Sequence, residues 1–231
     1  MSNGSKTDNT PIRKTNRSTV RRFAPRGSYD RNVLNSILDE CLVAHVGFNH
    51  EGHPSVLPMA FWRVDDYVYF HGAARNRMIS DLAKDDECCF VVSTIDALVL
   101  ARAAMHHSIN YRCVIIYGKP EEVIDTDAKL SAMKTFIERV YPGRWNDIRS
   151  PTDIELRAVR VMRLHIDEAS AKIRAEQPTY YPGDAHLPVW AGVVPFKISA
   201  GTPVPDPSVP ESILVPAHAL HYHHILEAAS A

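Results

Sequence analysis

The feature that most constrains the fold is a run of three short β-like stretches within 31 residues. The stretches are residues 42–49, 54–64 and 67–72. A turn containing Gly52 separates the first two, and Asp65 and Asp66 separate the last two. Parallel strands would need crossovers of roughly a dozen residues or more, and these short turns leave no room for them. The chain is therefore expected to form an antiparallel meander here.

Further strands and short helices are expected along the chain. Strands are predicted at residues 87–93, 98–104, 111–123 and 159–166, and the first two are expected to pair as a hairpin. Apolar residues at helical spacing predict helices that begin near Asp30, Arg75, Asp125 and Thr152. Many short strands with tight turns and few helices indicate a mainly β fold, a small closed or half-open barrel of antiparallel strands with peripheral helices.

Composition divides the chain into three parts. Residues 1–28 hold seven basic side chains and one acidic side chain, although the whole chain has a net charge of −1. This segment is expected to be a disordered, solvated tail. The alternative is a nucleic-acid-binding arm, but Phe23 is its one aromatic residue, and nucleic acid is not expected as a partner. Residues 29–175 are expected to form the barrel domain, and the proline-rich residues 176–231 to wrap it, with one strand near 189–196.

The sequence also argues against several classes of protein. No apolar run approaches the roughly 20 residues that a membrane-spanning helix needs. No apolar segment follows Met1, so a secretory signal is not expected. The four cysteines have no C-x-x-C spacing, which indicates reduced thiols in a cytoplasmic protein rather than disulfides or a cysteine-rich zinc site.

Two polar segments have residues suited to chemistry. In residues 71–78, small residues follow a strand, and Arg75 and Arg77 lie near the start of a helix. Backbone N–H groups can approach a ligand closely at small residues, and arginine offers paired donors to phosphate oxygens; two solvated arginines are the alternative. Residues 106–112 place polar side chains just before the longest β-like stretch, where they either face a ligand or form a surface turn.

The 12 histidines raise the question of a metal site. Seven of them gather at a turn and near the end of the chain, as His45, His50 and His53 and as His218, His221, His223 and His224. A mononuclear site needs three or four ligands held by surrounding groups, and no cysteine or acidic residue lies at a suitable spacing from either set. No functional metal site is predicted.

A set of motifs follows in a fixed order along the chain. They are residues 42–48, Tyr69-Phe70-His71-Gly72, Asn76-Arg77-Met78, residues 107–114, Tyr117-Gly118 and residues 141–145. In this order they resemble the pyridoxamine 5′-phosphate oxidase-like flavoproteins, the FMN-binding split-barrel family. Within it the chain looks most like the branch containing the 5-nitroimidazole reductases, with residues 188–192 as a further motif. The resemblance implies a split β-barrel and a homodimer with one FMN in each of two clefts between the subunits.

The resemblance also implies the residues of the site. Those expected to bind the cofactor are Pro58, Met59, Phe70, His71, Gly72, Arg75, Asn76, Arg77, Met78, Tyr111, Arg112 and Cys113. Arg77 matches the arginine of a phosphate-binding Ser-Arg-Lys run, in which Asn76 and Met78 replace a hydroxyl and a cation. Arg75 is expected to compensate for the missing charge. Tyr111 and Arg112 match a Tyr-Arg-Ser run that faces the cleft, with a cysteine in place of the serine.

His71 matches the active-site histidine of the nitroimidazole reductases and is the expected catalytic residue. It would donate a proton to the reduced substrate or, equally, only hydrogen-bond the cofactor. Arg112 is a candidate donor near the flavin N1 and O2 atoms. Trp190 either stacks near the flavin or fills the core, and the core is the expectation.

The function expected from this resemblance is that of an FMN-dependent oxidoreductase that reduces a small planar compound such as a nitroaromatic. Deazaflavin is an alternative cofactor. The alternative function is a non-catalytic module that binds or sequesters flavin or haem, with His45, His71 or His107 on the haem iron. A third hypothesis is a regulator with a basic arm that senses a ligand in the barrel.

Overall fold

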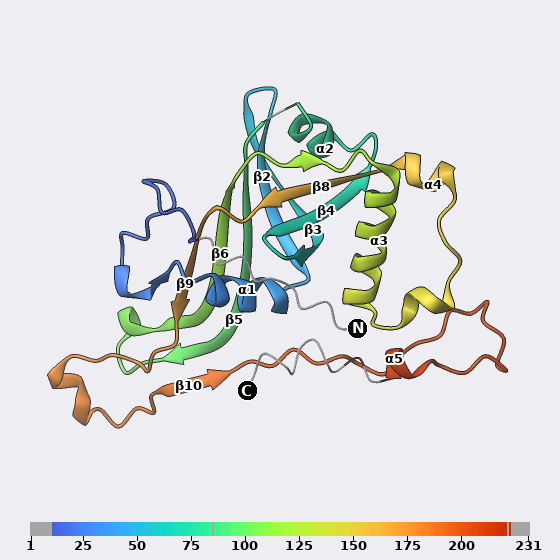
Figure 1. Cartoon of the computed structure of the whole chain (residues 1–231). Helices are drawn as coiled ribbons and strands as arrows, with labels where there is room; N and C mark the ends of the chain where they lie inside the picture. The colour runs from blue at the N-terminus through green and yellow to red at the C-terminus, as the bar shows by residue number, and fades with distance from the viewer. Residues whose placement is uncertain (1–10, 85, 221, 223–231) are drawn as a thin grey trace.

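The predicted three-strand meander forms part of a mainly β molecule (Figure 1). The computed structural model describes residues 11–84, 86–220 and 222. β2 (Val43–His50), β3 (His53–Val64) and β4 (Tyr67–Ala73) are antiparallel neighbours. Their tight turns hold Gly52 at a φ of 80° and Asp65 at a φ of 50°, in the left-handed region that hairpin turns use. The turn residues therefore direct the chain back on itself as the sequence predicted.

The remaining elements give a mainly β fold with peripheral helices, as predicted. The other strands among the described residues are β1 (Gly27–Ser28), β5 (Cys88–Leu100), β6 (Ser108–Gly118), β7 (Glu121–Glu122), β8 (Val159–His165), β9 (Glu168–Arg174) and β10 (Gly192–Pro195). The α-helices are α1 (Arg31–Glu40), α2 (Arg77–Leu82), α3 (Thr126–Val140), α4 (Asp153–Ala158) and α5 (Ala217–Leu220). Short 3-10 turns are η1 (Ala24–Arg26), η2 (Ala104–His106), η3 (Arg144–Asp147) and η4 (Pro182–His186).

The strands close into a barrel because β6 is followed by β7, and β8 by β9, along nearly the same line. The neighbours run in the order β5, β2, β3, β4 and β8. β7 follows β6 in the chain, and β9 follows β8. The pairs β6·β9 and β7·β8 continue one antiparallel ladder, from Tyr117 opposite Glu168 to Glu121 opposite Arg163. The row of strands thus returns to β6, which lies beside β5.

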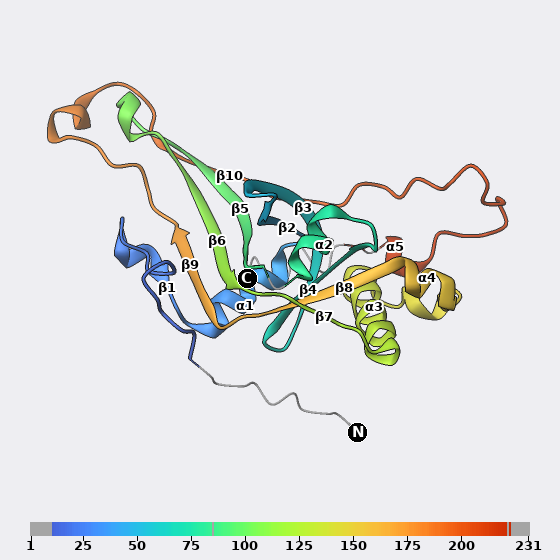
Figure 2. The same ribbon diagram turned by 90° about the horizontal axis from the view of Figure 1, so that it is seen from above.

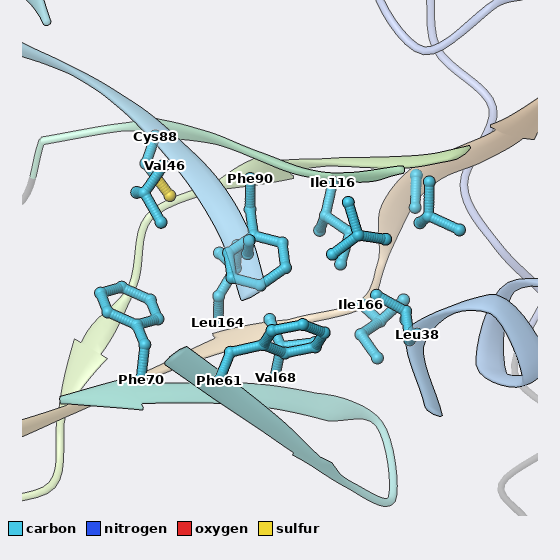
Figure 3. Close-up of a cluster of buried hydrophobic side chains, with 14 of the residues drawn as sticks. Leu38, Val46, Phe61, Val68, Phe70, Cys88, Phe90, Ile116, Leu164 and Ile166 are labelled. Carbon is cyan, nitrogen blue, oxygen red and sulfur yellow. The ribbon is translucent and has the colours of Figure 1, made fainter. Parts of the chain in front are cut away.

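Alternating side chains of these strands fill the barrel (Figure 3). The fully buried ones include Val46, Phe61, Phe70, Phe90 and Ile116. The rings of Phe61 and Phe90 meet edge to face with their centroids 5.1 Å apart. This packed interior is a core and leaves no space there for a ligand as large as a flavin.

α1 packs against this core, and α3 covers part of the outer wall. The N-cap residue of α1, Asp30, accepts a hydrogen bond from the Asn32 N–H at 2.8 Å, and the apolar face of the helix, including Leu34 and Leu38, is buried. α3 packs on the outward side chains of β3, β4 and β8, where Trp62 and Val161 are fully buried. The wall beneath α3 is therefore apolar on both of its faces.

One predicted hairpin is a single strand in the structure. Residues 87–93 and 98–104 were expected to pair with each other, but β5 runs through Cys88–Leu100 without a turn. The linking residues 94–97 contain no glycine or proline, and a register shift between Ile95 and Ala97 takes up the irregularity. β5 forms its hairpin with β6 instead, and that hairpin extends well beyond the barrel (Figure 2).

Residues 11–28, which we call the N-terminal arm, lie against the barrel. A solvated tail was expected here from the charge of the segment. Ile12 is buried in the barrel core, and β1 pairs with β9. Arg17 donates hydrogen bonds to the buried Glu168 at 2.8 Å and to Glu87 at 2.6 Å. The arm is ordered because acidic side chains on the barrel neutralise its basic ones.

Residues 176–220 and 222, which we call the C-terminal extension, follow the outside of the molecule (Figure 1). β10 lies where a strand was predicted and pairs with the far part of β5. Beyond β10 the chain runs without regular structure until α5, near one end of α3. Trp190 was expected to fill the core, but the residue is 65% exposed. Among the described residues, no helix combines the length and apolarity that crossing a membrane would require.

Candidate functional site

The predicted phosphate-binding segment lies between the end of β4 and the start of α2. Asn76 caps α2, because its side-chain oxygen accepts a hydrogen bond from the Ile79 N–H at 3.2 Å. A Cβ on Gly72 would lie 3.0 Å from Cγ1 of Ile79, so a glycine lets the helix pack closely on the strand. Arg75 and Arg77 are exposed on either side of the cap. The segment therefore presents two guanidinium groups at the surface.

These two arginines differ from those that stabilise the fold. Arg160 donates to Glu122 at 2.9 Å, and Arg63 donates to Asp39 at 2.8 Å. In contrast, the side chains of Arg75 and Arg77 have no hydrogen bond or ion pair with any residue that the structure describes. Two neighbouring cations without a counter-ion provide a suitable surface for a phosphate group.

His71 lies on the outer wall of β4 and packs against α3. The centroid of its ring is 5.1 Å from that of Phe136 and 5.9 Å from that of Trp62. Burial lowers the pKa of His71 below its usual value of 6.5, so the imidazole is neutral at neutral pH. Its Nδ1 atom is buried and has no hydrogen-bond partner within the described part of the chain. A neutral ring with one unused nitrogen suits a positioning role better than proton donation.

Arg112 is held by carboxylates rather than left free to face a cofactor. Its Nε donates to Asp96 at 2.9 Å, and its Nη2 donates to Glu40 at 2.8 Å. These hydrogen bonds raise the pKa of Arg112 above its usual value. Because Glu40 ends α1, the arginine fastens that helix to β6. A role of Arg112 as a donor to flavin would require these bonds to be exchanged.

The other predicted cofactor residues are divided between the two faces of the barrel wall. Met59, Phe70 and Met78 pack into the interior core. Tyr111 and Cys113 are half-buried on β6, and burial raises the pKa of the Cys113 thiol. Successive strand residues point to opposite faces, so a motif quoted as a run cannot place all its side chains in one site.

The outer face of β2, β3 and β5 carries exposed apolar side chains. β2 pairs with both β3 and β5, so their outward side chains lie on one surface. Val43, Val56 and Ile95 are exposed on these strands, and Pro58 is exposed opposite His45. An apolar sheet face of this kind is typical of a surface that binds a flat ligand or another protein chain.

A cavity of about 710 Å³, which we call the extension cavity, lies between α3, η3 and the C-terminal extension. Its lining is mostly apolar, for example Ile137 of α3 and Val204 and Ile213 of the extension. The polar or charged side chains in the lining are Tyr141, Arg144, His218 and Tyr222. Its volume lies within the roughly 300–1,000 Å³ usual for small-molecule sites.

Sequence reasoning missed the extension cavity because residues 200–216 have no helical or strand period. The available signal was a series of apolar residues among prolines in a segment with no regular structure of its own. A neighbouring cavity of about 390 Å³ shares Ile137 and Ile148 with the extension cavity.

The histidines considered as haem ligands lie apart from one another. His45 is exposed on β2, and the Nδ1 atom of exposed His107 lies 3.1 Å from the Ala103 carbonyl oxygen. His71 is under α3, as described above. His221, His223 and His224 lie outside the described residues. Within the described ranges, no group of three or more histidine, cysteine, aspartate or glutamate side chains could hold a metal ion.

Comparison with known proteins shows which family has this architecture. The model of the pyridoxamine 5′-phosphate oxidase family matches residues 30–173. The structure of the flavocytochrome Anf3 from Azotobacter vinelandii is 34% identical, with a TM-score of 0.86, and the match covers 91% of this chain and 98% of that one. The FAD and haem binding protein from Mycobacterium smegmatis is 31% identical, with a TM-score of 0.80, over 84% of this chain and 95% of that one.

A more distant structure shows the same fold. A proposed 5-nitroimidazole antibiotic resistance protein from Bacteroides thetaiotaomicron is 24% identical, with a TM-score of 0.54, over 64% of this chain and 86% of that one. The search of curated proteins returns no match. The family model spans more than half of the chain, and two structures exceed 30% identity over most of it. This chain belongs to the pyridoxamine 5′-phosphate oxidase-like family of split-barrel proteins.

Proposed function

We propose that this chain is a flavin-dependent oxidoreductase that acts as a homodimer and also holds a haem. The observation that supports this most is similarity over 91% and 84% of the chain to structures named as a flavocytochrome and as an FAD and haem binding protein. Such coverage includes the surfaces around the barrel as well as the barrel itself. FMN is the flavin implied by the resemblance in the sequence, and FAD is the flavin named for the mycobacterial structure.

Two features of this chain fit a flavin. The exposed apolar face of β2, β3 and β5 can cover an isoalloxazine ring if a second copy closes over it. Arg77 and Arg75 are uncompensated cations that can pair with the flavin phosphate. A bound flavin supplies hydride and one-electron transfer, whereas the protein orients it and excludes water.

His71 and Arg112 take different roles in this proposal from those first expected. His71 is kept neutral by burial, so it acts as a positioning residue beside the flavin. Arg112 holds α1 on the barrel through Glu40 and Asp96. The proposed acceptor class is a small planar compound such as a nitroaromatic, because a flat apolar slot admits a flat molecule. The four free cysteines support a reducing, cytoplasmic location.

A haem fits the chemistry of the extension cavity. The cavity is large and mostly apolar, and it contains one histidine, one arginine and two tyrosines. Haem supplies one-electron chemistry at iron when bound, and a single histidine is a common iron ligand. The second candidate function, a module that binds these groups without turnover, uses the same residues.

The test is the cofactor content and subunit count of the full-length protein. Native mass spectrometry and absorbance spectroscopy should show a dimer with flavin and a Soret band. Reduction by a nicotinamide donor, followed by reoxidation with a nitroaromatic, should then show turnover. A protein that holds flavin without turnover favours the non-catalytic module. A monomer that binds neither FMN nor FAD contradicts the proposal.

Arg77→Ala tests the phosphate assignment directly. The substitution should weaken flavin binding by about 1.5–3 kcal/mol, the usual contribution of a hydrogen bond to a charged group. Arg22→Ala is a matched control, because Arg22 is also exposed but lies in the N-terminal arm, which pairs with β9 and not with β4. Equal flavin dissociation constants for the two variants would remove Arg77 from the site.

A further inference from the structure

We infer that the extension cavity is the haem site, with His218 as the iron ligand and Asp147 as the carboxylate that orients it. The inference rests on the proposed function, because haem binding is part of that function. The location comes from this chain alone: the cavity lies between the consecutive elements α3 and η3 and the C-terminal extension, which is far from them in the sequence.

The walls of the cavity suit a large apolar ligand. Ile137 faces it from α3, and Val204 and Leu214 face it from the extension. Val204 is 89% exposed and Leu214 is 84% exposed, although both line the cavity. Apolar side chains gathered around an open volume of about 710 Å³ are stabilised when a ligand covers them. The hydrophobic effect therefore favours a broad apolar group here over a small polar one.

His218 has the surroundings of a metal-binding histidine. It lines the cavity, and its side chain is 19% exposed. Its Nδ1 atom lies 3.7 Å from Oδ2 of Asp147, at the end of η3. The carboxylate lies beside Nδ1, so Nε2 is the ring nitrogen that remains for iron.

The arginine in the cavity lining suits the propionates of haem. Arg144 lines the cavity and has no ion pair with any described residue. The turn that carries it is fixed, because Glu138 accepts the N–H groups of Gly143 and Trp145, both at 2.9 Å. The guanidinium group of an arginine on such a turn offers paired donors to a carboxylate. Besides Arg144, the charged groups near His218 are Asp147 and Glu138.

The extent of the structural matches agrees with this location. The family model ends at residue 173, before the extension. Residues 1–175 are about three quarters of the chain, so matches covering 91% and 84% of it must include part of the extension. Both of those matches are to structures named for haem or a cytochrome. Part of the extension is therefore shared with them.

The test is titration of full-length protein, freed of haem, with ferric haem in His218→Ala, Asp147→Asn and His107→Ala variants. Asp147→Asn should weaken haem binding by about 10–100-fold, as expected for the loss of a group that orients a metal ligand. His218→Ala should weaken it more and shift the Soret band. His107→Ala should match the wild type, because His107 is exposed and remote from the cavity lining. Added imidazole should restore the wild-type spectrum to His218→Gly, which a purely structural role would not allow.

Two different failures are distinguishable. If the wild type binds no haem while it still binds flavin, the haem part of the proposed function is wrong. If the wild type binds haem and His218→Ala keeps the same affinity and spectrum, the assigned location is wrong and the function stands. Loss of the Soret band in His71→Ala but not in His218→Ala would move the iron to β4. Flavin content and the thermal unfolding midpoint of each variant show whether the barrel is still folded.

Discussion

The two ends of this chain use the same barrel in opposite ways. The N-terminal arm is fastened to it by the buried Ile12 and by Arg17, which binds Glu168 and Glu87. The C-terminal extension is paired through β10 but leaves Val204 and Leu214 in open contact with solvent. The arm therefore completes the fold of one chain, whereas the extension has apolar surface that a ligand or a second copy can complete.

The difference also shows why composition alone misleads. The arm is basic and lacks apolar runs, yet it is ordered because its counter-charges lie on the barrel. The extension has more apolar residues, yet prolines prevent the regular pairing that would bury them. The arm should therefore contribute to the stability of the free protein, and the extension should contribute to binding.

The largest difference in stability between the arm and the extension is expected for Ile12→Ala. Removal of the buried side chain should lower the free energy of unfolding by about 2–5 kcal/mol, as for other buried isoleucines. The matched substitution Val204→Ala in the extension should change it by less than about 0.5 kcal/mol, because that side chain is exposed. Urea denaturation of both variants checks this. Equal effects would mean that the arm is as loosely held as the extension.

A smaller effect is expected for Glu168→Gln. The side chain of Glu168 accepts hydrogen bonds from Arg17, which lower its pKa from 4.5 to about 2. The stability that this provides is complete above pH 4.5 and is lost as the pH falls towards 2. The substitution should lower the free energy of unfolding at neutral pH by about 1.5–3 kcal/mol and flatten its decline in acid.

The control for Glu168→Gln is Glu121→Gln, which removes an exposed ion pair with Arg163. Exposed pairs contribute about 0–1 kcal/mol, so this variant should stay close to the wild type. Unfolding measured from pH 2 to pH 7 compares the three proteins. If Glu168→Gln declines in acid as steeply as the wild type, another carboxylate anchors the arm.

The barrel could be predicted from the sequence because its turns and strands are determined by residues that are close together in the chain. The turns at Gly52 and Asp65 leave no alternative to an antiparallel meander, and family motifs supply the rest. The order of the arm could not be predicted, because Arg17 meets Glu168 and Glu87 across 151 and 70 residues of sequence. Such contacts have no period or spacing that reveals them.

The candidate site was predictable to a smaller extent. Arg75 and Arg77 could be placed at the surface because a helix start follows a strand end. The sequence did not reveal that Glu40 and Asp96 bind Arg112, since all three lie on different elements. His218 and Arg144 meet at one cavity only because the extension returns to α3. Contacts between residues that are distant in the sequence are therefore the part of the site that cannot be predicted from the sequence.

The smallest expected effect concerns the wall beneath α3, the helix whose Ile137 lines the extension cavity. Burial lowers the pKa of His71 from 6.5, so the unfolded chain binds a proton there at a pH where the folded chain does not. Stability from this group is complete above pH 6.5 and is lost as the pH falls towards the lower pKa of the folded state. The extension side should therefore weaken at a higher pH than the arm, which depends on Glu168.

His71→Phe should abolish this pH dependence, because phenylalanine fits between Trp62 and Phe136 and carries no proton. The slope of unfolding free energy against pH just below 6.5 should flatten, while the slope in stronger acid, set by Glu168, should remain. Urea denaturation across the pH range measures both slopes in one protein. An unchanged slope just below pH 6.5 would show that His71 is protonated as readily in the folded chain as in the unfolded one. The region beneath α3 and the arm would then lose stability over the same range of acid pH.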